Sequence, residues 1–228
     1  MQKPLKIGHR GAKNHLAENT IESIKKALDI GVDGIEIDVH KCASGELVVF
    51  HDFTLDRMTN GTGELSKATL PQLKELKVNG QFSIPTLEEV LDCVDRQCLV
   101  NIELKGKHTA LDTCEIISHY MNVKGWSAQD FIISSFQHHE LEDVYNYNKN
   151  LRLGVLTKAS VFDALEFAKT INAYAVHPNF ALVSRDNVQR AQKEGYKVIT
   201  WTVNDVNTIK RMKSYGVDAI ISDNPENL

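Results

Sequence analysis

Several features that define common protein classes are missing from this chain of 228 residues. It has no apolar run near the about 18 residues of a membrane-spanning helix, and residues 1–10 lack the apolar core of a secretory signal. Its 26 Lys and Arg are outnumbered by 30 Asp and Glu, whereas nucleic-acid-binding proteins usually have a basic surplus. We therefore expect a soluble, cytoplasmic protein that acts on a small molecule, binds no nucleic acid and forms no stable membrane association.

Paired cysteines and glycine-rich loops are also missing. Cys42, Cys93, Cys98 and Cys114 form no Cys-x-x-Cys motif, and a chain of this length needs no disulfides to stay folded. Reduced, packed thiols are therefore expected. There is no Gly-x-Gly-x-x-Gly or Walker-type run, which argues against the nucleotide loops of many open doubly wound sheets.

The sequence does contain a regular alternation of short β-branched runs and amphipathic stretches, as in βα units around a parallel sheet. In one such stretch Ile21, Ile24 and Leu28 share a helical face. Eight units predict an α/β fold, a closed (β/α)8 TIM barrel, as one domain over residues 1–228. The expected strands cover residues 5–9, 34–40, 98–105, 131–136, 152–156, 173–177, 197–203 and 219–223.

Two segments depart from this alternation. Residues 47–50 are extended but follow the second strand too closely for a crossover helix, which predicts an extra strand or hairpin partner beside it. Residues 53–85 carry Thr, Asn, Gly and Pro over too great a length for a simple βα loop. We expect them to form a small insertion covering the barrel mouth that carries the active site.

Acidic and apolar side chains alternate in the run Ile-Glu-Ile-Asp-Val of the second strand. Because alternate side chains of a strand share a face, Glu36 and Asp38 should point together into the barrel. Asn101, Glu103 and Lys105 repeat the arrangement in the next long strand. Three inward carboxylates are suited to a hard divalent cation such as Mg²⁺, Ca²⁺ or Mn²⁺. The alternative is that Arg and Lys side chains neutralise them.

Two histidines and two further cations flank these carboxylates. His9 and Arg10 end the first strand, His51 follows the extra strand, and Lys105 ends the strand that carries Glu103. The set predicts acid–base cleavage at phosphorus, in which one histidine takes a proton from the attacking oxygen and the other protonates the leaving alkoxide. Arg10 and Lys105 would bind nonbridging phosphate oxygens, and the cation would offset developing charge.

Other residues allow two interpretations each. Asn19 either positions the histidine or phosphate or simply caps a helix. Phe136 and Trp201 either form an apolar wall for the substrate or pack in the barrel core. His177 is either a wall of the site or a loop residue. The remaining histidines are expected at surface or helix-end positions: His15, His40, His108, His119, His138 and His139.

Seven short motifs run along essentially the whole chain: His9-Arg10-Gly11, Glu18-Asn19-Thr20, Glu36-Ile37-Asp38-Val39, Val48-Val49-Phe50-His51-Asp52, Asn101-Ile102-Glu103-Leu104-Lys105, Trp201-Thr202-Val203-Asn204 and Ile221-Ser222-Asp223-Asn224-Pro225. Their order and spacing resemble the glycerophosphodiester phosphodiesterases. The resemblance implies a (β/α)8 barrel that hydrolyses glycerophosphodiesters to sn-glycerol 3-phosphate and an alcohol with the help of a divalent metal.

The resemblance also implies residue roles. The family's metal carboxylates fall on Glu36, Asp38 and Glu103, its catalytic histidines on His9 and His51, and its phosphate-binding residues on Arg10 and Lys105. Residues 53–85 resemble the family insertion that covers the glycerol side of the site. Met58 and residues 41–45 depart from the usual pattern at the mouth.

Two other functions share parts of this pattern. A lyase of the phospholipase type, acting on lipid headgroups, uses a similar barrel and two histidines, but the chain lacks a basic amphipathic segment for docking on a bilayer. A barrel that binds phosphometabolites without catalysis is the other alternative, although such a protein need not keep the whole set of charged residues.

Overall fold

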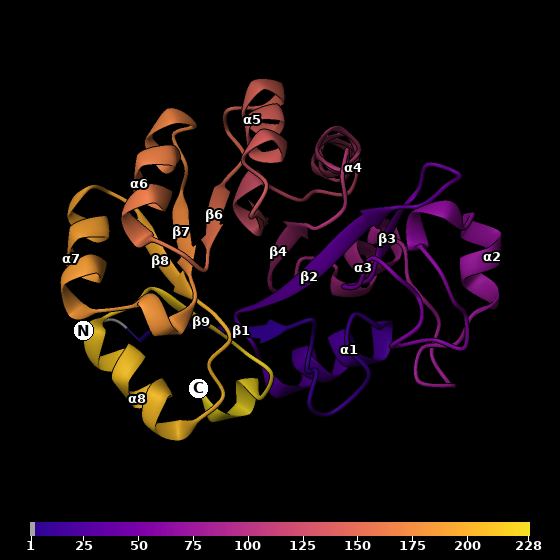
Figure 1. The fold of residues 1–228 in the computed structure, drawn as a ribbon, viewed down its shortest axis with the longest axis horizontal. Coiled ribbons are helices and arrows are strands. Elements are labelled where there is room, and N and C mark those ends of the chain that lie inside the picture. The colour runs from indigo at the N-terminus through magenta and orange to yellow at the C-terminus, as the bar shows by residue number, and fades with distance from the viewer. Residues whose placement is uncertain (1–2) are drawn as a thin grey trace.

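Residues 3–228, which the computed structural model describes, alternate between buried strands and amphipathic helices. Strands pair in the order β1-β9-β8-β7-β6-β5-β4-β2, and pairing of β1 with β2 closes the ring (Figure 1). The predicted (β/α)8 barrel is therefore confirmed. Its parallel strands are β1 (Leu5–His9), β2 (Gly34–Lys41), β4 (Leu99–Leu104), β5 (Phe131–Ser135), β6 (Leu153–Thr157), β7 (Ala175–Pro178), β8 (Lys197–Thr200) and β9 (Ala219–Ser222).

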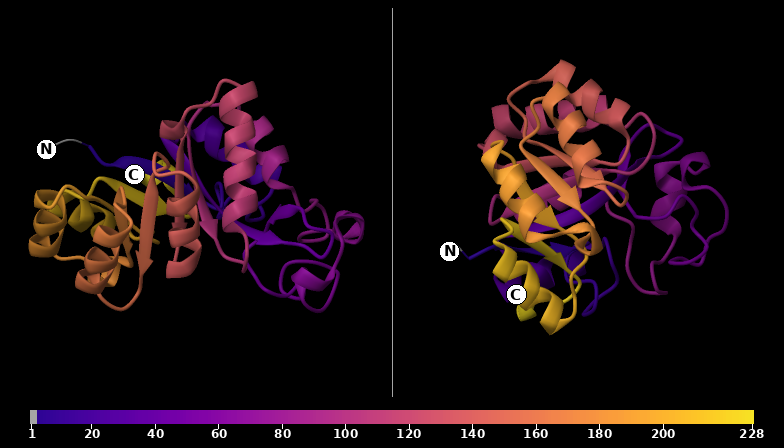
Figure 2. Two further views of the ribbon diagram at one scale, coloured as in Figure 1. Left: turned by 90° about the horizontal axis from the view of Figure 1, so that it is seen from above. Right: turned by 60° about the vertical axis from the view of Figure 1, so that its left-hand side comes forward.

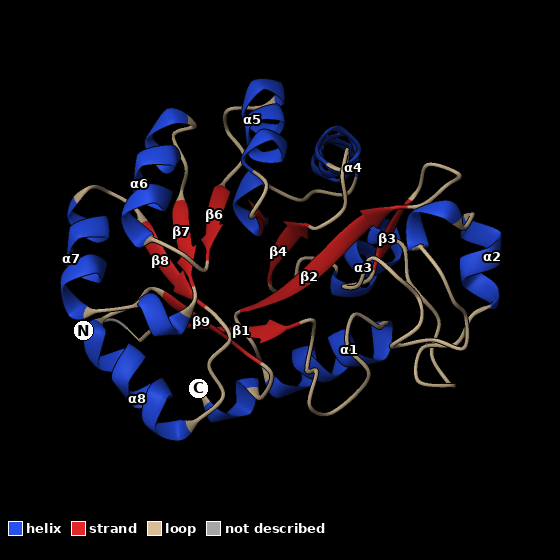
Figure 3. Cartoon of the chain, viewed as in Figure 1, coloured by secondary structure: helices blue, strands red, loops and turns tan. Residues whose placement is uncertain are grey.

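Helices surround the strands, as Figure 3 shows in blue and red. The first of them begins where the Thr20 side chain accepts a hydrogen bond from the Ser23 amide, and ends at Gly31, whose φ of 75° favours glycine. The outer helices are α1 (Ile21–Ile30), α3 (Leu87–Val94), α4 (Ala110–Val123), α5 (His138–Tyr147), α6 (Val161–Thr170), α7 (Arg185–Lys193) and α8 (Val206–Tyr215). Short 3-10 helices cover Leu65–Lys67, Ala128–Asp130, Phe180–Leu182 and Pro225–Asn227.

Strand β2 places apolar and acidic side chains on opposite faces. Ile35, Ile37 and Val39 are fully buried in the main apolar core, which includes residues of the surrounding helices. Glu36 and Asp38 therefore lie on the inner face, as the alternation predicts. Because all eight strands are parallel, residues near their carboxyl ends converge at one end of the barrel.

The extra strand β3 (Leu47–Val49) pairs antiparallel with β2, with Val39 opposite Val49. The connection is short and turns at Gly45, whose φ is 107°. The predicted hairpin partner of the second strand is thus confirmed. It brings His51, two residues beyond β3, back beside the inner face of β2.

Residues 53–85 form a lobe beside the barrel, with one helix, α2 (Leu70–Glu75), visible in the purple region of Figure 2. A separate apolar cluster joins the lobe to the barrel side: Leu55, Leu65 and Leu73 pack with Val48 and Phe50. The predicted insertion is present, and its role as a cover for the site stays a prediction.

None of the helices in residues 3–228 is long and apolar enough to cross a membrane. The expected cytoplasmic location stays a prediction. Cys42 and Cys114 are buried, and all four cysteines are unpaired.

Candidate active site

Three carboxylates meet inside the barrel, on the inward faces of β2 and β4. Asp38 lies opposite Glu103 in the strand register, and Glu36 lies one inward position below Asp38. One oxygen of each lies within 4.8 Å of the others, and all three residues are buried. The cluster arises because two neighbouring strands each place acidic residues on the inward face.

Burial and mutual repulsion govern the charge of this cluster. Burial, followed by the charges of Asp38 and Glu103, raises the pKa of Glu36 well above its usual value. Burial and the Asp38 charge raise the pKa of Glu103 to about 7. Burial acts on Asp38 as well, but the charges of Arg10 and Lys105 outweigh it and lower its pKa. The surroundings of Glu36 and Glu103 therefore disfavour their ionised forms, which a bound cation would favour.

Arg10 and Lys105 supply part of that charge. The Arg10 Nε lies 3.2 Å from Asp38 Oδ2, and its backbone N–H donates to Glu36 Oε2 at 3.1 Å. The Lys105 Nζ lies 2.9 Å from Glu103 Oε1 and 3.6 Å from Asp38 Oδ1. The ion pairs with Arg and Lys that the alternative interpretation expects are therefore present. The raised pKa values of Glu36 and Glu103 indicate that these pairs do not neutralise the carboxylate cluster fully.

The donor atoms fit a hard divalent cation. Within residues 3–228, the buried Asp38 Oδ1 and Asn101 Oδ1 have no hydrogen-bond partner. Oxygen donors of this kind, with carboxylates from three positions, are the ligands that Mg²⁺, Ca²⁺ and Mn²⁺ prefer. A buried acidic cluster with unpartnered oxygens points to a metal site, with no preference shown among these ions.

His9, at the end of β1, is oriented by a carboxylate from the other end of the chain. Its Nδ1 lies 2.5 Å from Asp223 Oδ1, and Asn204 donates to the second oxygen of Asp223 at 2.7 Å. Its Nε2 lies 3.9 Å from Glu36 Oε2, at the cluster. Burial lowers the pKa of His9 against the opposing effect of Asp223. The ring therefore keeps Nδ1 engaged and presents Nε2 to the site.

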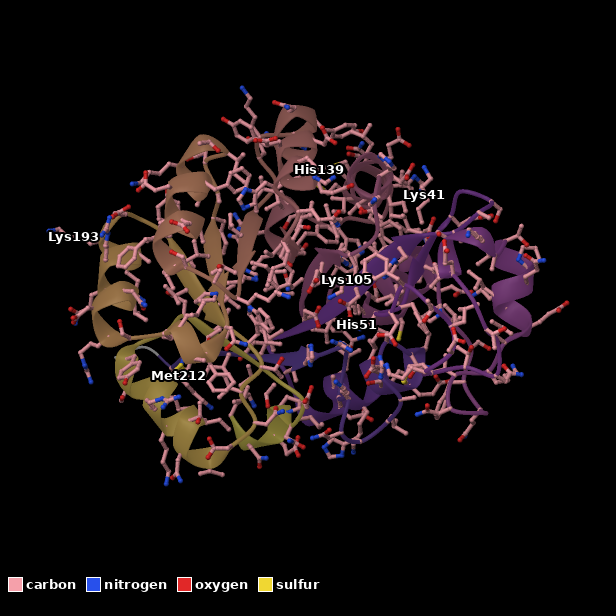
Figure 4. All side chains as sticks on the ribbon, in the orientation of Figure 1. Lys41, His51, Lys105, His139, Lys193 and Met212 are labelled. Atoms are coloured by element: carbon pink, nitrogen blue, oxygen red, sulfur yellow. The ribbon has the colours of Figure 1, made fainter. Side chains whose placement is uncertain are left out.

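His51 has a matching carboxylate. Its Nδ1 lies 2.6 Å from Asp52 Oδ1, and Arg57 of the insertion donates to both oxygens of Asp52 at 2.5 and 2.9 Å. Hydrogen bonding from Arg57 holds the pKa of Asp52 well below its usual range, while burial lowers that of His51. In Figure 4, His51 and Lys105 lie near each other beside β2, in the middle of the view, whereas Lys193 and His139 lie on the surrounding helices.

A buried carboxylate links these groups. Glu18 accepts hydrogen bonds from Arg10 at 2.7 Å and from Arg57 at 2.6 Å, and Lys13 lies 3.5 Å from its second oxygen. Burial raises the pKa of Glu18, but hydrogen bonding from Arg57 and the charges of Arg10 and Lys13 bring it to about 2. Glu18 thus joins the phosphate-binding candidate Arg10 to the insertion.

The structure decides several of the two-way interpretations. Asn19 does not cap α1, because Thr20 does; its side-chain amide donates to Asp38 Oδ2 at 3.0 Å. Phe136 and Trp201 contact each other edge to face, with ring centroids 5.5 Å apart, at the ends of β5 and β8. Their contact with substrate stays a prediction.

Two histidines differ from what the sequence suggested. His40 is not at the surface or at a helix end: it lies buried in β2, and its Nε2 contacts the His51 carbonyl at 3.1 Å. Strand alternation alone predicts an inward position for this residue, since it lies two residues beyond Asp38. His177 is not a loop residue but is fully buried in β7.

The sequence reasoning also missed the partners that orient the histidines. Asp223 and Asn204 lie within the family motifs and Asp52 follows His51, but a motif alone does not show which side chains contact each other. Arg57 directly precedes Met58, where the family pattern departs, but its contacts with Asp52 and Glu18 have no local sequence signal. Chain separation hides such contacts, since His9 and Asp223 are 214 residues apart.

Comparisons with known proteins show the family of the whole chain. Residues 9–227 match the model of the glycerophosphoryl diester phosphodiesterase family. A glycerophosphodiester phosphodiesterase of Caldanaerobacter subterraneus subsp. tengcongensis is 37% identical over 235 residues, covering 99% of this chain and 96% of the relative. One from Bacillus altitudinis is 33% identical over 236 residues, covering 96% and 94%.

The fold is also similar to solved structures. A phosphodiesterase of Oleispira antarctica, in complex with the product sn-glycerol-3-phosphate, has a TM-score of 0.89 at 28% identity, covering 98% of this chain and 94% of the other. The matches extend over nearly the full length of each protein, so the similarity includes both the barrel and the insertion.

Proposed function

Because the chain belongs to the glycerophosphoryl diester phosphodiesterase family and is a glycerophosphodiester phosphodiesterase, we propose that two histidines carry out the proton transfers of the hydrolysis beside a divalent cation. The products are glycerol 3-phosphate and an alcohol. The histidines are His9 and His51, and the cation ligands are Glu36, Asp38 and Glu103. The single observation that carries the proposal is that both imidazoles have Nδ1 engaged by a carboxylate next to this cluster.

The residues of the chain divide the work as follows. Each neutral imidazole holds its proton on Nδ1 toward Asp223 or Asp52, so Nε2 is the atom that can take up a proton. One histidine accepts the proton of the attacking oxygen, and the other, once protonated, donates to the leaving alkoxide. Burial lowers the pKa of both rings, which favours the neutral base. The Asp223 and Asp52 carboxylates oppose that shift and favour the protonated ring that the acid must carry at the start; proton exchange with solvent restores both rings after each turnover.

Arg10 and Lys105 hold the phosphate oxygens in this proposal. Their positive groups already lie at the carboxylate cluster, at the open end of the barrel. A divalent cation bound there supplies positive charge that stabilises the charge developing on the phosphate. Asn19 keeps Asp38 oriented, and Phe136 with Trp201 provides an apolar wall beside the site.

Substitution of the histidines tests the assignment. His9→Ala and His51→Ala should each reduce the release of glycerol 3-phosphate from a panel of glycerophosphodiesters by at least about a hundredfold, since a positioned acid or base contributes roughly that much. Circular dichroism should show an unchanged fold. His119→Ala, on the exposed side of α4, is the matched control and should keep full activity. Full activity in either active-site variant would refute the assignment.

Removal and return of the metal tests the ligands, with a readout besides activity. Binding to the folded state stabilises a protein, so Mg²⁺, Ca²⁺ or Mn²⁺ should raise the Tm of chelator-treated protein. Asp38→Asn should abolish that rise, and Asp112→Asn, on α4, should not. If none of the three ions changes the Tm of the chelator-treated protein, the metal site is contradicted.

The attacking oxygen distinguishes two routes. Water can attack phosphorus directly, or the glycerol 2-hydroxyl can attack first and give a cyclic phosphate, which the same residues then hydrolyse. Phosphorus NMR of the reaction separates them, since only the second route shows a transient cyclic signal. A cyclic product that accumulates without hydrolysis would instead indicate the lyase alternative.

A further inference from the structure

We propose that a cavity at the amino-terminal end of the barrel, which we call the basal cavity, binds a small amphipathic anion: a phosphate or carboxylate group on an alkyl body. The cavity has a volume of about 710 Å³, within the usual range of ligand sites. It is lined by residues at the beginnings of strands, among them Leu5, Leu99 and Lys197. It therefore lies opposite the carboxylate cluster and is separate from the active site.

The floor of the basal cavity is apolar. Ile132, Ile199 and Ala219 line it and belong to the apolar layer inside the barrel. Leu99 is half-buried, and Leu5 is 42% exposed at its edge. An alkyl chain of a ligand would remove this surface from water, and the favourable free energy grows with the apolar area covered.

The rim of the basal cavity is positively charged, although the chain as a whole has a net charge of -4. It contains Lys3, Arg152, Arg185 and Lys197, against a single acid, Asp218. The Asp218 carboxylate is fully engaged: Lys197 Nζ lies at 3.0 Å, and the Val198 amide and the Gln192 side chain donate to its other oxygen. Three cations are left without a carboxylate partner in the described part of the chain.

Two of these cations are held in place by aromatic rings. The Arg152 guanidinium lies 4.7 Å from the centroid of Tyr174, and that of Arg185 lies 5.6 Å from the centroid of Tyr215. One N–H group of Arg152 donates a hydrogen bond to the Gln129 carbonyl at 3.1 Å. A stacked guanidinium keeps its remaining N–H groups at its edge, where they can bind the oxygens of a phosphate or carboxylate.

The apolar floor and the cationic rim together determine the class of ligand. Inorganic phosphate, or a glycerophosphodiester of a small polar alcohol, has no apolar part to cover the floor, and a neutral alkyl compound does not use the rim. An anionic head on an alkyl body satisfies both parts of the cavity at once. The proposal concerns a second ligand site, and it stands independently of the chemistry at the carboxylate cluster.

Titration calorimetry with defined probes tests the basal cavity. Octyl phosphate and octanoate should bind at one site per chain, at least about tenfold more tightly than octanol or inorganic phosphate, and more weakly as salt is raised. Comparison of the two probes identifies the preferred head group. The titrations are repeated with excess glycerol 3-phosphate, which occupies the catalytic site and should not displace either probe.

Variants locate the binding. Arg152→Met and Arg185→Met keep the side-chain stem and remove the charge, so each should weaken binding by at least about fivefold and the double variant further. Arg190→Met is the matched control. Arg190 is on the same helix as Arg185 but outside the cavity, and its guanidinium lies 4.7 Å from the centroid of Phe162, so its replacement should not change the affinity for either probe. Thermal unfolding verifies that each variant is folded.

Several outcomes would overturn the proposal. These are binding no tighter than that of octanol and inorganic phosphate, displacement by glycerol 3-phosphate, and affinity unchanged in the double variant. A change of oligomeric state in the double variant, measured by sedimentation, would show instead that the cavity is a contact between copies of the chain.

Discussion

At the scale of single residues, the carboxylates behind the two histidines decide which ring nitrogen exchanges protons. Asp223→Asn keeps the shape and a hydrogen-bond acceptor but removes the charge that stabilises the protonated His9 ring. We expect kcat to fall by at least about tenfold with little change in KM, because the residue acts through His9 and does not contact the substrate.

The matched control for Asp223 is Asp143→Asn, an exposed acid on α5. Steady-state kinetics over a range of pH should show an altered profile for Asp223→Asn alone. A kcat equal to that of the wild-type protein would show that Asp223 does not orient a catalytic group.

Gly154 and His177 form a second residue-scale pair, deep in the barrel. A Cβ at Gly154 would overlap the His177 imidazole. Burial lowers the pKa of His177 to about 3, so the ring is neutral, and neither nitrogen has a partner in residues 3–228. Gly154→Ala should therefore cost about 1–3 kcal/mol of unfolding free energy through overpacking.

A double-mutant cycle measured by urea unfolding checks this contact. In a His177→Ala background the same Gly154→Ala change should cost much less, because the overlapping ring is gone. Equal costs in the two backgrounds would show that Gly154 is required for another reason.

At the scale of elements, α4 begins without a capping residue of its own. Thr109, in the N-cap position, has a helical backbone and its side chain makes no capping hydrogen bond. Glu140 of α5 replaces it: its buried carboxylate accepts hydrogen bonds from the amides of His108, Thr109 and Ala110, at 2.5 to 3.0 Å. A charge supplied by the next helix thus stabilises the start of α4.

Glu140→Gln should lower the unfolding free energy by about 1–3 kcal/mol. The Gln side chain has only one acceptor oxygen, whereas both carboxylate oxygens of Glu140 accept from the three backbone N–H groups. Glu142→Gln, on the exposed side of the same helix, is the control and should be nearly neutral. Denaturant unfolding gives both values. If the two substitutions cost the same, the capping role is wrong.

Local periodicity explains which elements the sequence could predict. Alternation in β2 placed Glu36 and Asp38 inside the barrel, and the structure brings them together with Glu103. The same alternation places His40 on the inward face, where the structure buries it, although no acidic residue adjoins it in the sequence. The Glu140 cap and the His9–Asp223 pair had no local signal, because they depend on which elements the closed barrel makes adjacent.

At the scale of the whole molecule, Glu18 ties the barrel mouth to the insertion. Its pKa of about 2 lies below its ordinary value of 4.5, so its ion pairs stabilise the folded state above pH 4.5, and this contribution disappears as the pH falls toward 2. Glu18→Gln should therefore lower the unfolding free energy by about 1–2 kcal/mol at pH 7.

The difference between the wild-type protein and Glu18→Gln should shrink as the pH is lowered from 5 to 2, measured by urea unfolding at each pH. Glu22→Gln, an exposed acid on α1, is the control. A gap between wild type and Glu18→Gln that is constant over this range would contradict the ionised role of Glu18.

The two ends of the insertion meet at β3. The Val49 amide donates to the Pro85 carbonyl at 2.8 Å, and Val48 pairs with Thr86, so the chain leaves the barrel and returns to it at almost the same place. An apolar cluster joins the lobe to the barrel side, with Leu65 and Leu73 packed with Val48 and Phe50. Such an attachment lets the length and sequence of the lobe vary while the barrel strands stay fixed, provided that Arg57, which binds Asp52 and Glu18, is kept.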